Sequence, residues 1–235
     1  MTHLVKTLGL IGGMSWESTT LYYQHLNRMA RERLGGQHSA SLILLSVDFA
    51  PIAGMQSAGL WDEASAVMID AAKRLEAAGA QGLVICANTM HRMADDVASA
   101  IGIPLIHVAD ATASVIVAAG VRRPLLLATR YTMEQGFYRE RLRRFGVDAG
   151  IPSEADRARL QSIIYDELIQ GLVKLASREA VVAMVESAVR GEAADGVILG
   201  CTELALLVGP DDLPVPVFDT TEIHAKAAMD FALGS

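Results

Sequence analysis

Two similar apolar stretches, LVICANTMH at 83–91 and GVILGCTEL at 196–204, indicate the fold of this chain. Each is a run of apolar residues that ends abruptly in small polar ones, and each contains one of the two cysteines, Cys86 or Cys201. Short continuous apolar runs of this kind, each following a helix-like segment, are typical of buried strands in a parallel sheet. Both cysteines are therefore predicted to lie near the carboxyl ends of strands.

Strand-like runs alternate with amphipathic helical patterns along the whole chain. The predicted strands are 8–12, 41–47, 82–87, 103–108, 123–129 and 196–201, and the predicted helices are 18–34, 61–79, 132–146 and 178–194. Continuous apolar strands joined by helices predict parallel βαβ units that are covered on both faces. The sequence thus predicts an α/β protein.

The second part of the chain repeats the pattern of the first. GGMSWESTTLYYQHLNR at 12–28 matches ATRYTMEQGFYRERLRR at 128–144, and AAGAQGLVICANT at 77–89 matches EAADGVILGCTEL at 192–204. We therefore predict two halves, one formed by 1–115 with 214–235 and the other by 116–213. Two such halves are expected to leave a cleft at the carboxyl ends of their strands, where ligands bind in α/β folds.

Aligning the two cysteine-bearing strands does not pair the cysteines. When Gly82 is set on Gly196, Ala87 rather than Cys86 becomes the equivalent of Cys201. Because side chains alternate along a strand, the offset of one residue places the two thiols on different sides. The alignment predicts one functional thiol, at Cys201, and a methyl group at the equivalent position.

A thiol at a strand end is able to act as a nucleophile or as a general base. Thr202 and Glu203 follow Cys201, and a helix beginning there is expected to favour the thiolate. No histidine lies beside Cys201 in sequence, although His91, His107 or His224 could approach it in space. The alternative is that a free cysteine is a buried apolar residue, and this is our prediction for Cys86.

Composition excludes several classes of partner and site. The formal charge of −7 argues against nucleic acid or an anionic membrane as the main partner. Two cysteines without a CxxC or a His/Cys cluster indicate neither a disulfide framework nor a metal site. The first residues lack the features of a signal peptide, and no apolar run is long enough to span a bilayer, so a cytoplasmic location is expected.

Seven motifs together carry a resemblance to a known family. They are GLIGGMSWEST at 9–19, SVDF at 46–49, NTMH at 88–91, HVADAT at 107–112, TRYTMEQGFY at 129–138, GCTEL at 200–204 and FDTTEIHA at 218–225. With them the chain resembles the aspartate/glutamate racemases that need no pyridoxal phosphate. The resemblance implies two Rossmann-like parallel-sheet halves in pseudo-two-fold relation, an active-site cleft between the domains, no cofactor, and a homodimer.

In that family two residues, usually cysteines, flank the substrate Cα, and one removes the α-proton while the other returns a proton. The resemblance implies that Cys201 is one of them. The other position is occupied here by Ala87, which cannot transfer a proton. Either Cys86 reaches the cleft through a bulge, or a water held by Asn88, Thr89 or His91 carries the proton, or the chemistry is one-sided.

Binding of the substrate requires donors for the enolate charge that develops at its carboxylate. The residues expected to bind the substrate are Met14, Asn88, Thr89, Thr129, Thr132 and Thr202. The leading hypothesis is an isomerase, an amino-acid racemase or epimerase of the aspartate/glutamate type. The alternatives are a one-thiol lyase or isomerase acting on a small carboxylic acid, and a catalytically impaired protein that binds an amino acid or a dicarboxylate.

Overall fold

The computed structural model describes residues 5–191 and 194–234. The chain divides into two compact units, unit 1 formed by Met1–His107 with His224–Ser235 and unit 2 formed by Val108–Ile223. Each unit contains a three-stranded parallel sheet with helices around it. The predicted α/β class and the division into two similar halves are confirmed.

The boundaries of the units differ from the predicted ones, which lay after 115 and before 214. Helix α5 (Val108–Ala118) begins at the first residue of unit 2 and contributes Val108 and Ile116 to that unit's core. Strand β6 (Val217–Asp219) pairs with the central strand of unit 2. Packing and strand pairing therefore assign both segments to unit 2, which the local sequence pattern did not indicate.

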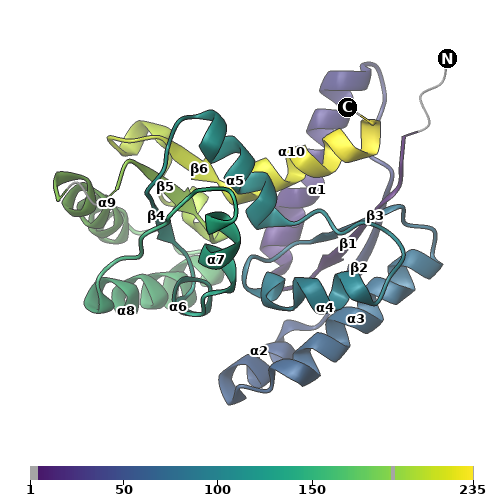
Figure 1. Cartoon of the computed structure of the whole chain (residues 1–235), viewed down its shortest axis with the longest axis horizontal. Coiled ribbons are helices and arrows are strands. Elements are labelled where there is room, and N and C mark those ends of the chain that lie inside the picture. Colours follow the sequence, from purple (N-terminus) through teal and green to yellow (C-terminus); the bar gives the residue numbers. More distant parts are fainter. Residues whose placement is uncertain (1–4, 192–193, 235) are drawn as a thin grey trace. The chain divides into compact units, whose positions relative to one another are not determined.

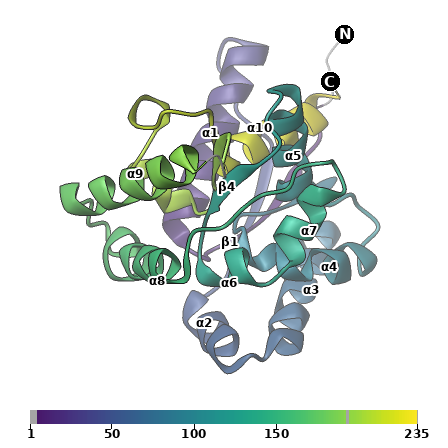
Figure 2. The same cartoon turned by 60° about the vertical axis from the view of Figure 1, so that its left-hand side comes forward.

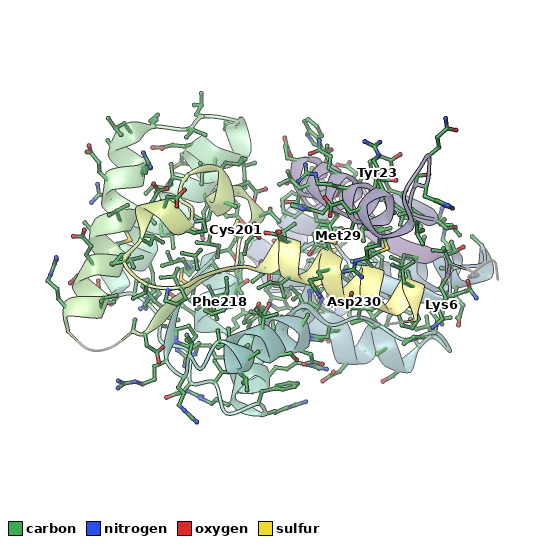
Figure 3. The ribbon with its side chains drawn as sticks, turned by 90° about the horizontal axis from the view of Figure 1, so that it is seen from above. Lys6, Tyr23, Met29, Cys201, Phe218 and Asp230 are labelled. Carbon is green, nitrogen blue, oxygen red and sulfur yellow. The ribbon has the colours of Figure 1, made fainter. Side chains whose placement is uncertain are left out.

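Unit 1 is built on the strand order β2-β1-β3, with all strands parallel. Its strands are β1 (Leu8–Gly12), β2 (Leu42–Ser46) and β3 (Gly82–Ile85), and its helices are α1 (Trp16–Leu34), α2 (Phe49–Ala58), α3 (Trp61–Ala77), α4 (Ala94–Ser99) and most of α10 (Thr220–Leu233). Alternate residues of β1 and β3 belong to two cores, one with α1 and α10 and the other with α3. Figure 1 shows α1 and α10 on one side of this sheet and α3 on the other. Asp230 of α10, labelled in Figure 3, joins α1 through an ion pair with Arg33 at 2.5 Å.

Unit 2 has the strand order β4-β5-β6, again with parallel pairing. Besides α5 and β6, it contains β4 (Pro124–Leu127), α6 (Arg130–Glu134), α7 (Phe137–Arg143), α8 (Glu154–Ser162), α9 (Leu175–Arg190) and β5 (Gly196–Leu199). Helices α8 and α9 lie on one side of the sheet, and α5 and α7 lie on the other (Figure 2). Helices on both faces explain why all four residues of β4 and of β5 are buried.

The two sheets share one topology and one register. In unit 1, β1 pairs with β2 and β3, and β3 extends to Leu105 through an isolated parallel bridge. In unit 2, β4 pairs with β5 and bridges to Gly150, and β5 extends to β6. Gly82 opens β3 beside the first residue of β1, as Gly196 opens β5 beside the first residue of β4. The repeat seen in the sequence is therefore a structural repeat, in which Ala87 and Cys201 occupy equivalent positions.

Two predicted elements differ from the structure. The predicted strand at 103–108 is reduced to the bridge at Leu105, because Pro104 has no N–H to donate and α5 already begins at Val108. The predicted helix at 132–146 is two short helices, α6 and α7, with Gln135 in an extended conformation between them. Helices α2 and α8 were not predicted, since neither has a clear apolar face.

We expect Gly13→Ala to lower the free energy of unfolding by about 2 kcal/mol or more, since Gly13 has φ of 93° and a Cβ there would lie 2.1 Å from the carbonyl oxygen of Val47. Urea denaturation measures the change. The control is Gly54→Ala, at an exposed position of α2 where a Cβ meets no atom within 4 Å. That variant should be neutral or gain up to about 1 kcal/mol from helix propensity. Equal stability of the two variants would contradict the prediction.

Candidate active site

The carboxyl ends of β4 and β5 bring the predicted residues of unit 2 to one edge of its sheet. The two strands are in register from Pro124 and Gly196 onward, so Thr129 and Cys201 follow neighbouring strands at the same edge. Thr129 precedes α6, and its hydroxyl lies 3.2 Å from that of Thr132, whose side chain is fully buried. Two hydroxyls that can each donate or accept a hydrogen bond are thus held next to the strand that carries the thiol.

Cys201 is held by the residues that follow it. Its thiol donates to the Glu203 carboxylate at 3.0 Å, and the Thr202 hydroxyl donates to the same carboxylate oxygen at 2.6 Å. All three side chains are buried, and Cys201 is 8% exposed. Cys201 lies at the end of the segment that leaves β5, and it is labelled in Figure 3. The sulfur therefore lies beside a buried carboxylate instead of being enclosed by hydrocarbon alone.

The charge state of Cys201 differs from the expectation drawn from the sequence. Burial raises the pKa of the Cys201 thiol well above its usual range, and the adjacent Glu203 carboxylate raises it further. A backbone N–H of Glu203 lowers the pKa of this thiol, but it is the smallest contribution. The helix that begins at Thr202 is only a five-residue 3-10 helix, Thr202–Leu206. The expected helix-stabilised thiolate is therefore wrong, and the resting form is the protonated thiol.

Sequence analysis did not identify Tyr165, which is electrostatically coupled to Cys201. It lies on a single π-helical turn, Ile163–Glu167, that follows α8. Burial raises the pKa of the Tyr165 phenol, and Cys201, Tyr131 and Glu203 raise it further. The phenol thus stays protonated and able to donate. π-Helical turns are frequent at functional sites, but no motif in the sequence marks this one.

The predicted residues of unit 1 follow the neighbouring strands β1 and β3. Met14 comes after β1 and packs into the core that also contains α3. Asn88 and Thr89 follow β3, where Asn88 is buried and Thr89 begins the 3-10 helix Thr89–Met93. Ala87 precedes them, and its methyl group packs at the margin of the same core as Met14. Unit 1 therefore places all its predicted binding residues at the carboxyl edge of its sheet, with no thiol at position 87.

Cys86 belongs to the core of unit 1. It is fully buried among residues of β1, α1 and α10, and burial raises the pKa of its thiol. The pairing of β3 with β1 continues in register, and the N–H of Cys86 donates to the carbonyl of Ile11 at 2.9 Å. No bulge turns Cys86 toward the position of Ala87. The prediction that Cys86 is a core residue is confirmed.

Three histidines gather beside Ala87 in unit 1. The Nδ1 of His91 lies 2.9 Å from the carbonyl oxygen of Ala87, and its ring contacts those of His107 and His224 with centroids at 4.7 and 5.4 Å. His224 is fixed on both sides, by the Tyr22 hydroxyl at 2.8 Å and the Ile106 carbonyl at 2.7 Å. Burial lowers the pKa of His224 to about 4, so this imidazole stays neutral. The sequence contains the three histidines, but nothing in it indicated that their rings contact one another.

Within residues 5–191 and 194–234, no group of three or more His, Cys, Asp or Glu side chains is arranged to hold a metal ion. No helix in this described part is both long enough and apolar enough to cross a bilayer.

Comparison with known proteins identifies the family. The family model described as Asp/Glu/Hydantoin racemase matches residues 11–228. The crystal structure of a candidate Asp/Glu racemase from Yersinia pestis has 49% sequence identity and a TM-score of 0.91, and the match covers 97% of this chain and 99% of that one. PH1733 from Pyrococcus horikoshii OT3, an aspartate racemase homologue, has 36% identity and a TM-score of 0.86 with the same coverage.

A more distant relative is the broad specificity amino-acid racemase RacX of Bacillus subtilis (strain 168), which is 19% identical over 94% of this chain and 96% of its own length. Racemases are isomerases, and the family match spans most of the sequence. The chain therefore belongs to the Asp/Glu/hydantoin racemase family of isomerases.

Proposed function

We propose that the chain is a cofactor-independent amino-acid racemase of the aspartate/glutamate type, in which the Cys201 thiol exchanges a proton with the substrate Cα. The observation that carries the proposal is the position of Cys201 at the carboxyl end of β5, held by the Glu203 carboxylate at 3.0 Å. The family match supports a small amino acid as the substrate. The proposal includes a homodimer and a cytoplasmic location; sedimentation and cell fractionation test these.

The chemistry requires a proton donor and stabilisation of negative charge. Loss of the α-proton leaves its electron pair delocalised into the substrate carboxylate, where hydrogen-bond donors stabilise the developing charge. In the proposal, the hydroxyls of Thr129 and Thr132 and the backbone N–H of Thr202 are the donors of unit 2, since the Thr202 hydroxyl already donates to Glu203. The binding residues proposed for unit 1 are Asn88, Thr89 and the backbone near Met14.

For one enantiomer the Cys201 thiolate takes the α-proton and becomes S–H, and water returns a proton to Cα. For the other enantiomer water takes the α-proton, and the Cys201 S–H delivers its proton to Cα and becomes a thiolate.

The resting charge state predicts unequal kcat values for the two enantiomers. A thiol whose pKa is raised by burial and by Glu203 is mostly protonated at neutral pH. It is therefore ready to protonate a carbanion, but it must lose its proton before it can remove one. We infer that kcat is higher in the direction in which Cys201 acts as the acid, while kcat/KM is equal for the two enantiomers because racemisation has an equilibrium constant of one.

Two other functions would use the same thiol. A lyase or isomerase acting on a small carboxylic acid needs a proton from one side only, and Ala87 at the position equivalent to Cys201 is compatible with such chemistry. A binding protein that performs no chemistry is the other alternative, again because of Ala87. Both alternatives predict that optical inversion is absent.

Exchange in heavy water distinguishes the three functions. We expect L- and D-aspartate, or L- and D-glutamate, to lose their Cα–H signal in proton NMR while polarimetry records inversion. Exchange without inversion would support one-sided chemistry. Binding without exchange, measured by calorimetry, would support the binding protein, and the absence of both binding and exchange would contradict the proposed substrate class.

A further inference from the structure

Three of the four edges of the two sheets are protected in the described part of the chain. The outer side of β3 is covered through the bridge to Leu105, and that of β4 through the bridge to Gly150. Strand β6 is only three residues long, follows Pro216 and ends in Asp219. Covering segments, short length, proline and charge are all means by which sheet edges are kept from pairing with other chains.

Strand β2, at the fourth edge, has none of these protections. Among the residues that the structure describes, it pairs with β1 alone. The stretch SLILLSV at 41–47 contains neither a charged residue nor proline. Leu44, the central residue of β2, is 48% exposed. An exposed and uncharged apolar edge of five residues is able to pair with another strand.

The backbone of β2 presents unused hydrogen-bonding groups at this edge. The carbonyl of Ser41 accepts from β1 at 2.9 Å, and the N–H of Val47 donates to β1 at 3.0 Å. Because alternate residues of a strand bond to the same neighbour, the odd-numbered residues of β2 face β1. The N–H and C=O groups of Leu42, Leu44 and Ser46 therefore point away from β1, and no described residue bonds to them.

Apolar side chains flank this edge on the α1 side of the sheet. Leu44 lies on the same face as Leu42, which packs against the core formed with α1 and α10. Tyr23 of α1, labelled in Figure 3, is 56% exposed. Asn27, one turn further along α1, accepts from the N–H of Ala40, just before β2, at 3.1 Å. This face of α1 therefore runs beside β2, and Tyr23 and Leu44 extend the exposed edge into an apolar surface.

We propose that β2 pairs in antiparallel orientation with β2 of a second copy of this chain, about a two-fold axis through Leu44. A two-fold axis brings a strand onto its own sequence, so any charge in β2 would meet a like charge, and β2 has none. The outward-pointing residues Leu42, Leu44 and Ser46 are symmetric about Leu44, so each of them finds a partner. The pairing rests on the homodimer included in the proposed function and supplies its interface.

The contacts across the axis follow from this register. Leu44 faces Leu44 of the partner subunit, and Leu42 faces Ser46 of the partner subunit. Each of these facing pairs exchanges two backbone hydrogen bonds, roughly six in all. On the α3 side of the sheet, Ile43 faces the partner's Leu45, so two partly buried apolar side chains meet there. The sheets of the two copies of unit 1 thereby become continuous.

Leu44→Lys tests this interface because it places two ammonium groups at the axis. We expect sedimentation to show wild-type dimers, and the dissociation constant of the variant to be higher by about 100-fold or more, since like charges that face each other are unfavourable. The matched control is Leu175→Lys, at a 67% exposed leucine of α9 in unit 2, which should change the dissociation constant by less than about threefold. Circular dichroism checks that both variants are folded.

Cross-linking tests the register of the pairing. Facing residues of an antiparallel pair have Cα atoms about 5.5 Å apart or less. A short bis-maleimide should therefore join Leu44→Cys to its own copy, whereas Leu175→Cys should stay uncoupled. The wild-type chain, whose Cys86 and Cys201 are buried, is the blank. If Leu44→Lys does not fold, the cross-link of Leu44→Cys decides.

A dimer that persists in folded Leu44→Lys, or a Leu44→Cys dimer that is not cross-linked, overturns the pairing. Dissociation caused by Leu175→Lys instead of Leu44→Lys also overturns it, in favour of a surface on unit 2. Wild-type protein that stays monomeric at every concentration tested would contradict both the pairing and the proposed homodimer. Failure of the racemase function has a different signature, because dimers that exchange no Cα–H would contradict the proposed catalysis and leave the pairing intact.

Discussion

Cys201→Ser should lose Cα–H exchange with every amino-acid substrate, by a factor on the order of 10²–10⁴. A serine hydroxyl is a far weaker acid than a thiol, so it protonates a carbanion more slowly and forms almost no anion near neutral pH to remove the α-proton. The hydroxyl can still donate to Glu203, so the hydrogen bond that positions residue 201 is retained. Proton NMR in heavy water measures the exchange, and calorimetry should record that substrate binding is largely kept.

Cys86→Ser is the matched control because it makes the same chemical change at the other cysteine. Cys86 is fully buried in the core, so a hydroxyl there should lower the free energy of unfolding by about 1–3 kcal/mol. Exchange per folded molecule should nevertheless stay close to that of the wild type. Loss of exchange in folded Cys86→Ser, with activity retained in Cys201→Ser, would contradict both the strand register and the mechanism.

The strand register of the two cysteine-bearing segments could be predicted from the sequence because it depends on local signals. Gly82 and Gly196 each open an apolar run after a helix, and in both sheets that glycine pairs with the first residue of the neighbouring strand. Alternation along the strand then separates Cys86, in the core, from Ala87. The period of a strand and the position of its first residue are enough to predict which side chain faces the core.

The electrostatics of the site could not be predicted in the same way. The sequence placed a helix after Cys201 and therefore suggested a lowered pKa, but the sign is set by burial and by the direction in which the Glu203 carboxylate points. Tyr165 is near Cys201 because a π-helical turn follows α8. The ring of His91 contacts that of His224 because α10, which carries His224, packs in unit 1. Each of these features is a tertiary contact between segments without a shared local pattern.

Glu203→Gln should lower the pKa of the Cys201 thiol. The amide keeps an oxygen that can accept from Cys201 and Thr202, but it removes the negative charge that opposes ionisation of the sulfur. Burial remains and still raises the pKa, so the change is a partial return toward the usual range. More thiolate should be present at any given pH. The acid limb of the pH profile of Cα–H exchange should therefore move to lower pH. Thiolate ultraviolet absorbance during a pH titration, with Cys201→Ser as the blank, measures this.

The consequence for catalysis depends on whether Cys201 acts as an acid or as a base. With more thiolate present, exchange of the enantiomer that needs Cys201 as base should rise by about tenfold at neutral pH, whereas the direction that needs the S–H should not gain. Glu179→Gln, at an exposed position of α9, removes the same charge elsewhere in unit 2 and should change neither direction. If both directions changed equally in Glu203→Gln, the carboxylate would be acting on folding or substrate binding. A change of kcat in one direction only, with kcat/KM still equal for the two enantiomers, would support Glu203 as the residue that sets the protonation state of the sulfur.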